Sequence, residues 1–110
     1  MIGKLVYKRN SVRTLPAGSY WGVIVGEDSH SFPDGKGGMT APTMCWKVFS
    51  YPISPEKQGK RVEFHMKDHM TTELEEVLPQ VKTYLLSDPY YSNYVSLSDE
   101  ERLETIKELM

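Results

Sequence analysis

Residues 43–51 read Thr-Met-Cys-Trp-Lys-Val-Phe-Ser-Tyr, a run that is rich in β-branched and aromatic side chains and contains neither Gly nor Pro. This composition predicts a β-strand. Because side chains alternate between the two faces of a strand, the run divides into two rows. One row is Met44, Trp46 and Val48, and the other is Cys45, Lys47, Phe49 and Tyr51. If the first row faces the core, the second presents a lysine between exposed aromatic rings. If helices cover the second row, both faces are buried.

Three further segments of the same character surround this run. They are Lys4–Lys8, Gly18–Gly26 and Lys60–Met66, and clusters of Gly, Pro, Asn and Ser separate them. In the last segment the apolar residues Val62, Phe64 and Met66 share one face, which we expect to face the core. The sequence therefore predicts a small antiparallel β-barrel or curved sheet of four to five strands.

Beyond Asp68 the apolar residues recur at spacings of three and four, the pattern of an amphipathic helix. They are Met70, Leu74, Val77, Leu78, Val81 and Leu85. Thr72 and Glu75 have the spacing of a capping box, and Pro79 is expected to kink or split the helix. Ser98 and Glu101 form a second capping box, which predicts a final helix. The fold class is therefore α+β, with two to three helices after the sheet.

The length of 110 residues predicts a single domain, 1–110. Its charge is unevenly divided. The β-rich part, residues 1–68, carries ten Lys or Arg and six Asp or Glu, whereas the helical part, residues 69–110, carries three and nine. The formal net charge of −2 therefore hides a basic and an acidic half, a polarity typical of proteins that contact a polyanion. Exposed Glu on helices accounts for the same split without any partner.

The cysteine content and the hydropathy of the sequence indicate the cellular compartment in which we expect the protein. Cys45 is the only cysteine, so a disulfide framework is excluded. Residues 1–13 are basic and lack the apolar region of a secretion signal, and no apolar run approaches the roughly 18 residues of a membrane span. We expect a cytoplasmic protein without a membrane partner.

Residues 28–42 join two predicted strands without a periodic pattern of their own, and they include three Gly, two Pro, Phe32 and Lys36. Loops of this length within a compact domain are usually functional or disordered. The functional interpretation is a flexible β-hairpin arm that folds over a ligand. The alternative is a tolerated surface excursion.

Motifs for catalysis are weak. Residues 34–38, Asp-Gly-Lys-Gly-Gly, lack the spacing and the following helix of a phosphate-binding loop. His65 and His69 do not share one helical face, so a metal site that joins them to His30 and Asp68 is disfavoured against surface imidazoles. Cys45 lies in mid-strand without a nucleophile signature. We expect a binding protein that is not an enzyme and needs neither cofactor nor metal; the sequence assigns these histidines no role.

The order of segments carries a resemblance. Residues 13–25, Arg-Thr-Leu-Pro-Ala-Gly-Ser-Tyr-Trp-Gly-Val-Ile-Val, precede a glycine-rich arm, then Cys45-Trp-Lys-Val-Phe49, then Gln58-Gly-Lys-Arg-Val-Glu-Phe64. This order, over roughly residues 13–66, resembles small phage-type single-stranded DNA-binding proteins with an OB-like β-barrel. Those proteins often end in a disordered acidic tail, whereas two predicted helices close this chain. The Leu-Pro-Ala-Gly-x-Tyr entry is also common in SH3-like barrels.

The resemblance implies a single-stranded nucleic acid as partner. It places base stacking on Tyr20 or Trp21, Phe49 and Tyr51, backbone contacts on Lys47, Lys60 and Arg61, and arm contacts on Phe32 and Lys36. The mixed row of residues 45–51 fits this chemistry, because bases stack on aromatic rings while the nucleic-acid backbone follows positive charge.

A second hypothesis is a small phage-type protein that binds a host protein and inhibits or adapts it. Its acidic C-terminal part would then oppose a basic partner surface. The residues concerned are Glu73, Glu75 and Glu76, and Asp99, Glu100 and Glu101, with Tyr90, Tyr91 and Tyr94 as aromatic anchors. A homodimer is open under either hypothesis.

Overall fold

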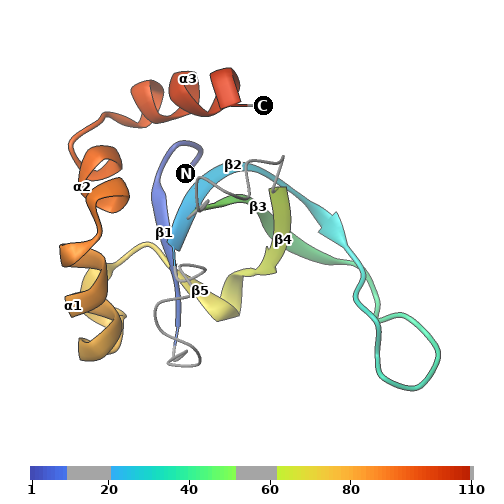
Figure 1. Ribbon diagram of the computed structural model, residues 1–110. Helices are drawn as coiled ribbons and strands as arrows, with labels where there is room; N and C mark the ends of the chain where they lie inside the picture. Colours follow the sequence, from blue (N-terminus) through green and yellow to red (C-terminus); the bar gives the residue numbers. More distant parts are fainter. Residues whose placement is uncertain (10–20, 52–61, 110) are drawn as a thin grey trace.

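The computed structural model describes residues 1–9, 21–51 and 62–109 (Figure 1). Five antiparallel strands form one sheet in the order β4-β3-β2-β1-β5. They are β1 (Leu5–Lys8), β2 (Trp21–His30), β3 (Thr43–Tyr51), β4 (Val62–Met66) and β5 (Met70–Thr71). Three helices follow, α1 (Pro79–Ser87), α2 (Pro89–Val95) and α3 (Asp99–Leu109). The predicted α+β class is confirmed, in the form of a curved sheet that does not close into a barrel.

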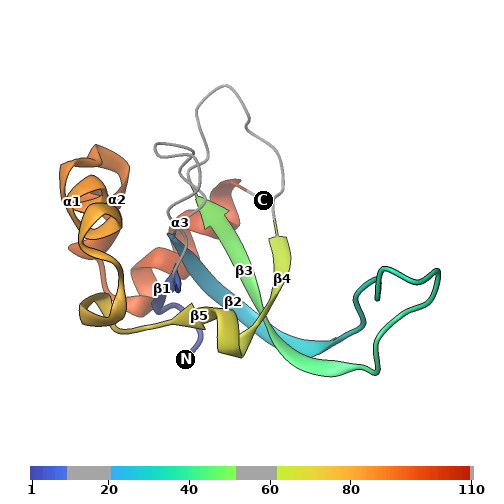
Figure 2. The same cartoon turned by 90° about the horizontal axis from the view of Figure 1, so that it is seen from below.

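The chain crosses from one edge of the sheet to the other between β4 and β5. The short 3-10 helix η2 (Lys67–His69) makes this connection and contacts both β3 and β5 (Figure 2). Lys67 lies over the Trp46 ring, with its Nζ 5.6 Å from the ring centroid, and forms an ion pair with Glu27. The crossing segment therefore covers one face of the sheet, the face of Trp46, which we call the inner face; the opposite face is the outer face. The buried residues of the inner face are Val6, Ile24, Trp46, Val48 and Met70.

The helices cover the outer face of the sheet beside β1 and β2. This second, larger core joins Leu5, Tyr7, Trp21, Val23 and Phe49 of the strands to Val77, Val81, Leu85, Tyr91, Tyr94 and Ile106. The strand residues share one face because β1 and β2 pair Leu5 with Val23 and Tyr7 with Trp21. Of the two arrangements open for residues 43–51, the structure adopts the one in which both faces are buried, from Cys45 to Phe49 with Lys47 half-buried. Met44, expected in the core row, is 51% exposed because it lies where the strand leaves the body of the protein.

The segment after η2 departs from the single predicted helix. Met70 belongs to β5, and a short 3-10 helix, η3 (Leu74–Glu76), precedes α1. Pro79 occupies the first turn of α1, so the expected split at this proline is confirmed. The capping box predicted for Thr72 and Glu75 is wrong, because η3 has no side-chain cap. Thr71 acts here instead: its hydroxyl donates to Glu76 Oε2 at 2.7 Å and accepts from the Glu73 amide at 3.0 Å.

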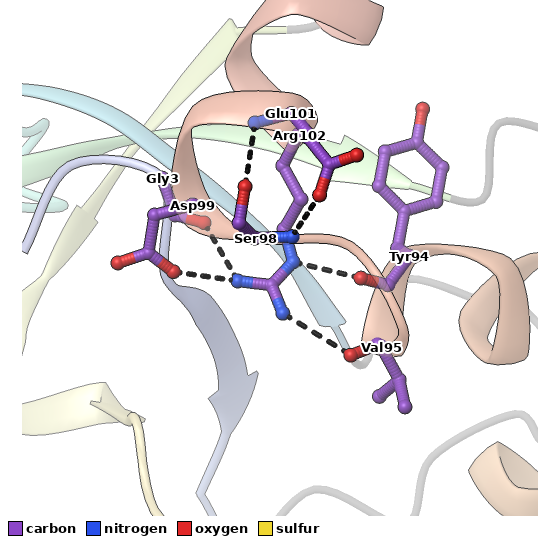
Figure 3. A network of polar contacts seen from close by, with 7 residues as sticks. All are labelled: Gly3, Tyr94, Val95, Ser98, Asp99, Glu101 and Arg102. Carbon is purple, nitrogen blue, oxygen red and sulfur yellow. Dashed lines mark hydrogen bonds and ion pairs between the residues drawn. The ribbon is translucent and has the colours of Figure 1, made fainter.

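The capping box of α3 is confirmed. Ser98 Oγ accepts from the Glu101 amide at 3.2 Å, and Glu101 Oε1 accepts from the Ser98 amide at 3.0 Å (Figure 3). Hydrogen bonding of its carboxylate to the Ser98 amide and to the Ser98 hydroxyl lowers the pKa of Glu101. Next to the cap, Arg102 is buried and its guanidinium donates to the carbonyl oxygens of Tyr94, Val95 and Gly3. The C-terminal helix is thereby tied to α2 and to the start of the chain.

None of the helices in the described part of the chain combines the length and apolarity that a bilayer crossing requires.

Candidate functional site

Two of the predicted stacking residues lie in the core. Trp21 is 1% exposed and Phe49 is 2% exposed, and both pack beneath the helices. The Trp21 ring meets Tyr91 and Tyr94 edge to face, with centroids 5.4 and 5.6 Å apart. The prediction that Trp21 and Phe49 present their rings to a ligand is wrong, because the helices cover the outer face of the sheet at these two positions.

Four other predicted residues receive no structural test. Tyr20, Lys60 and Arg61 lie outside the described residues. Tyr51 ends β3, where its backbone pairs with Trp21, but its side chain lies outside the description. Their assignment to nucleic-acid contacts stays a prediction.

A different set of aromatic rings gathers at the far end of the outer face, where β2 and β3 leave the body of the protein. We call His30, Phe32, Lys47 and Phe64 the arm-base cluster. The His30 and Phe64 rings stack in parallel, with centroids 4.2 Å apart and an interplanar angle of 3°. Phe32 meets His30 edge to face at 4.9 Å, and Lys47 Nζ lies 5.7 Å from the Phe64 centroid. All four side chains are partly exposed. The cluster therefore combines aromatic faces with a cation at an accessible place.

Phe64 was expected in the core and is only half-buried. The helices reach the sheet near Val62, which packs against the outer core, and leave Phe64 beside Lys47, its cross-strand partner. Gly26 faces Lys47 on the other side, and a Cβ on that glycine would lie 3.4 Å from Lys47 Cδ. The absence of a side chain at Gly26 thus leaves room for the aliphatic stem of the lysine.

The arm continues β2 and β3 as a hairpin that projects from the body (Figure 1). β2 extends to His30, beyond the end at Gly26 that the sequence predicted. Phe32 and Thr40 hold the two sides together, because the Thr40 amide donates to the Phe32 carbonyl at 2.8 Å and the Phe32 amide donates to Thr40 Oγ1 at 3.0 Å. Residues 28–42 therefore form a hairpin, and that it folds over a ligand stays a prediction.

Asp34 organises the tip of the arm. Its Oδ1 accepts from the amides of Lys36 at 2.7 Å and Gly38 at 3.1 Å, and Gly35 and Gly37 adopt positive φ angles of 79° and 86°. Only glycine adopts such angles without strain. The turn presents Lys36 as an exposed side chain at the tip. The two arm residues predicted from the sequence, Phe32 and Lys36, thus occupy its base and its tip.

Charge at the site is mixed. Lys47 lies 3.8 Å from Asp28, a carboxylate on the neighbouring strand. Elsewhere in the β-rich part Arg9 pairs with Glu76 at 3.2 Å, and Lys67 pairs with Glu27. The positive charge of the β-rich part is therefore partly neutralised at these positions. Lys36, at the tip of the arm, is an exposed cation.

The aromatic anchors of the second hypothesis are largely buried. Tyr91 is 3% and Tyr94 is 7% exposed, so the prediction that they anchor a partner is wrong. They lie in α2, a helix capped by Asp88. The Tyr91 hydroxyl is hydrogen-bonded to that of Tyr7 at 2.7 Å. Tyr90 remains partly exposed, as do the acidic side chains of Glu73, Glu75 and Glu100.

The described His, Cys and acidic side chains do not come together in a metal or catalytic site. No group of three or more His, Cys, Asp or Glu suited to a metal ion occurs among the described residues. His65 lies on the inner face, where Glu63 Oε2 is 3.4 Å from its Nε2. Cys45 is fully buried, its thiol donates to the Thr43 carbonyl at 3.2 Å, and burial raises its pKa. A thiol in this setting is kept protonated, which disfavours a nucleophilic role.

Comparison with known proteins yields no match to a family model, a curated protein or a solved structure. The geometry of the arm-base cluster and the arm is therefore the basis for assigning a function.

Proposed function

We propose that this protein binds single-stranded nucleic acid, without catalysing a reaction, through the arm-base cluster and the tip of the arm. The observation that carries the proposal is the parallel stack of His30 on Phe64, flanked by Phe32 and by the ammonium group of Lys47. A base stacks on a flat aromatic ring, and its phosphate pairs with a nearby cation. This mode of binding depends little on the base sequence.

The arm extends this chemistry beyond the sheet. Phe32 offers a ring at the base, and Lys36 offers a charge at the tip, so a strand that stacks at the base can run along the arm toward Lys36. A lysine that contacts the nucleic-acid backbone displaces condensed counterions. The binding affinity therefore falls as the salt concentration rises. The predicted binding is therefore salt-dependent and depends little on base sequence.

The order of sequence segments supports the same function through its resemblance to phage-type single-stranded DNA-binding proteins. In this proposal the protein works in the cytoplasm, that of the host cell where the protein is viral. The binding surface differs from the one that the resemblance implies, because the rings of Trp21 and Phe49 are buried and those of His30 and Phe64 take their place.

The test is a titration of a fluorescently labelled oligothymidylate of about 20 nucleotides, a length that exceeds the span of one small binding domain. Fluorescence anisotropy measures the binding at about 50 and 300 mM salt. We expect binding at the lower salt and at least a tenfold loss at the higher. Phe32→Ala and Lys36→Glu should each weaken binding several-fold. Leu86→Ala and Lys107→Glu, at exposed positions on α1 and α3, are the matched controls.

Absence of binding at the lower salt would contradict the proposal, as would an equal loss in Lys36→Glu and Lys107→Glu. The alternative, a role in blocking or adapting a host protein, then becomes the hypothesis to test. Its exposed acidic residues are Glu73, Glu75, Glu76, Glu100 and Glu101, and reversal of charge at Glu73, Glu75 and Glu100 would abolish binding to a basic partner while leaving the arm untouched.

A further inference from the structure

His30 has an imidazole ring whose nitrogens are not used by the fold. The ring stacks on Phe64 with centroids 4.2 Å apart, and it meets Phe32 edge to face at 4.9 Å. It is partly exposed, and neither of its nitrogens forms a hydrogen bond or an ion pair with the described residues 1–9, 21–51 and 62–109. The neighbouring rings therefore hold the plane of the imidazole while its two polar atoms keep their capacity to bind a ligand.

The charges closest to His30 along the outer face offset each other. Asp28, two positions earlier on β2, lies 3.8 Å from Lys47 of β3. Thr43, the cross-strand neighbour of His30 on β3, and Phe64 of β4 are uncharged. The base of the arm thus holds one cation and one anion, which are paired with each other.

The other titratable groups nearby leave this balance unchanged. The Cys45 thiol is buried on the outer face of β3, and burial raises its pKa, so it carries no charge. Glu27 and Lys67 form an ion pair on the inner face. Asp34 and Lys36, at the tip of the arm, carry opposite charges. A proton on the imidazole would therefore turn a nearly neutral cluster of rings into a cationic one.

An imidazole fits a phosphate best in its charged form. The neutral ring has one donor and one acceptor nitrogen, whereas the imidazolium has two donors and a positive charge. The free oxygens of a phosphodiester only accept hydrogen bonds, and they carry negative charge. Histidine is the side chain whose charge normally changes between about pH 8 and pH 5. Phosphate binding and protonation of such a ring therefore favour each other.

We propose that protonated His30 is a phosphate contact of the arm-base cluster, so that the protein binds single-stranded nucleic acid with the uptake of a proton. This inference rests on the proposed function and adds control by pH to the same site. Because Asp28 offsets the charge of Lys47, the imidazolium supplies the net positive charge that the base of the arm otherwise lacks.

The test compares the affinity for labelled oligothymidylate at about pH 7.5 and pH 5.5, a range that spans the usual titration of histidine. Neither thymine nor a phosphodiester changes its charge in this range, so a change in affinity reports on the protein. We expect binding to be at least about fivefold tighter at the lower pH. The slope of log affinity against log salt should also steepen there by up to about 0.7, the contribution of one phosphate contact on a single strand.

The chain has three histidines, which allows matched variants. His30→Phe keeps an aromatic ring at this position but cannot take up a proton, so it should bind equally at both pH values. His65→Gln and His69→Gln, outside the arm-base cluster, should keep the wild-type pH dependence. The amino group of Met1 is common to all variants and cannot cause a difference between them. Circular dichroism at both pH values establishes that each variant is folded.

Calorimetry counts the proton in the unmodified protein. Isothermal titration at about pH 6.5 in two buffers of different ionisation enthalpy gives the number of protons taken up for each protein bound. We expect a fractional uptake, below one proton, for the wild type and none for His30→Phe.

Equal wild-type affinity at the two pH values, or no proton uptake, would overturn this inference and leave the proposed function in place. A pH dependence that persists in His30→Phe, or that disappears in His69→Gln, would also overturn it. Absence of binding at both pH values would contradict the proposed function itself, and this inference with it. The two proposals therefore fail by different results.

Discussion

Arg102 Nη1 donates a hydrogen bond to the carbonyl oxygen of Gly3 at 3.1 Å, and the two residues are 99 positions apart in the sequence. The same guanidinium donates to the Tyr94 carbonyl at 2.8 Å and pairs with Asp99 at 2.8 Å (Figure 3). Gly3 has a positive φ of 92°, and a Cβ at that position would lie 2.6 Å from the carbonyl oxygen of Asp99. The start of the chain and α3 are therefore fitted to each other through backbone contact.

Gly3→Ala should destabilise the protein by about 2–4 kcal/mol, because it adds a steric clash to the strain of a positive φ. Chemical denaturation measures the free energy of unfolding. Gly35→Ala is the matched control, since Gly35 also has a positive φ, 79°, but nothing within 4 Å of the added Cβ. It should cost only about 1–2 kcal/mol. Equal losses in the two variants would contradict the close contact of Gly3 with α3.

Arg102→Lys should lower the free energy of unfolding by about 2–3 kcal/mol although it keeps the charge. A lysine ammonium cannot reproduce the planar fork that serves three carbonyl groups and Asp99, so buried acceptors lose their donor. Lys107→Arg, on the exposed side of α3, is the control and should change stability by less than about 0.5 kcal/mol. A neutral Arg102→Lys would show that the network contributes little.

The buried hydroxyl pair of Tyr7 and Tyr91 predicts a double-mutant cycle. Their oxygens are 2.7 Å apart, and burial is the main cause that raises both pKa values. Either Tyr→Phe variant should cost about 1–2 kcal/mol, because the remaining hydroxyl loses its partner. The double variant should cost less than the sum, since no orphan hydroxyl remains. Strict additivity in urea denaturation would contradict direct coupling of β1 to α2.

His65 predicts how stability changes with pH. Burial lowers its pKa below the usual 6.5; Lys8 and His69 lower it further, and Glu63 opposes them. The folded state therefore favours neutral imidazole, and this contribution to stability is complete above about pH 6.5 and is lost as pH falls toward the folded pKa. His65→Gln should lose less stability than the wild type between pH 7.5 and pH 5. His69→Gln, at an exposed position, should retain most of the wild-type slope.

Local patterns predicted much of the fold. The period-two runs located four strands, the spacing of Ser98 and Glu101 located the start of α3, and Pro79 divided the helical segment, because each depends on residues within one or two turns. β5 escaped prediction because two residues, Met70 and Thr71, carry no period. Their strand exists only through pairing with Tyr7 and Lys8.

The site was harder to predict because burial depends on what packs above a strand. Phe49 and Phe64 both belong to outward rows of adjacent strands, yet α1–α3 cover the first and leave the second beside the arm. Period two counted from Trp21 and Val23 would have placed His30 on the opposite, inner face, and only the β-bulge between Ile24 and Gly26 brings it to the outer face. The parallel stack of His30 on Phe64 needs the twist of the whole sheet, which no local pattern contains.

The most direct test of the proposed function is an NMR titration of the isotope-labelled protein with an unlabelled single-stranded oligonucleotide at low salt. We predict that amide shifts concentrate at residues 28–40, at Lys47 and at Phe64, while the amides of α1, α2 and α3 stay in place. Shifts that concentrate on the acidic helical part, or an unchanged spectrum at saturating oligonucleotide, would contradict the assignment of nucleic-acid binding to the arm-base cluster.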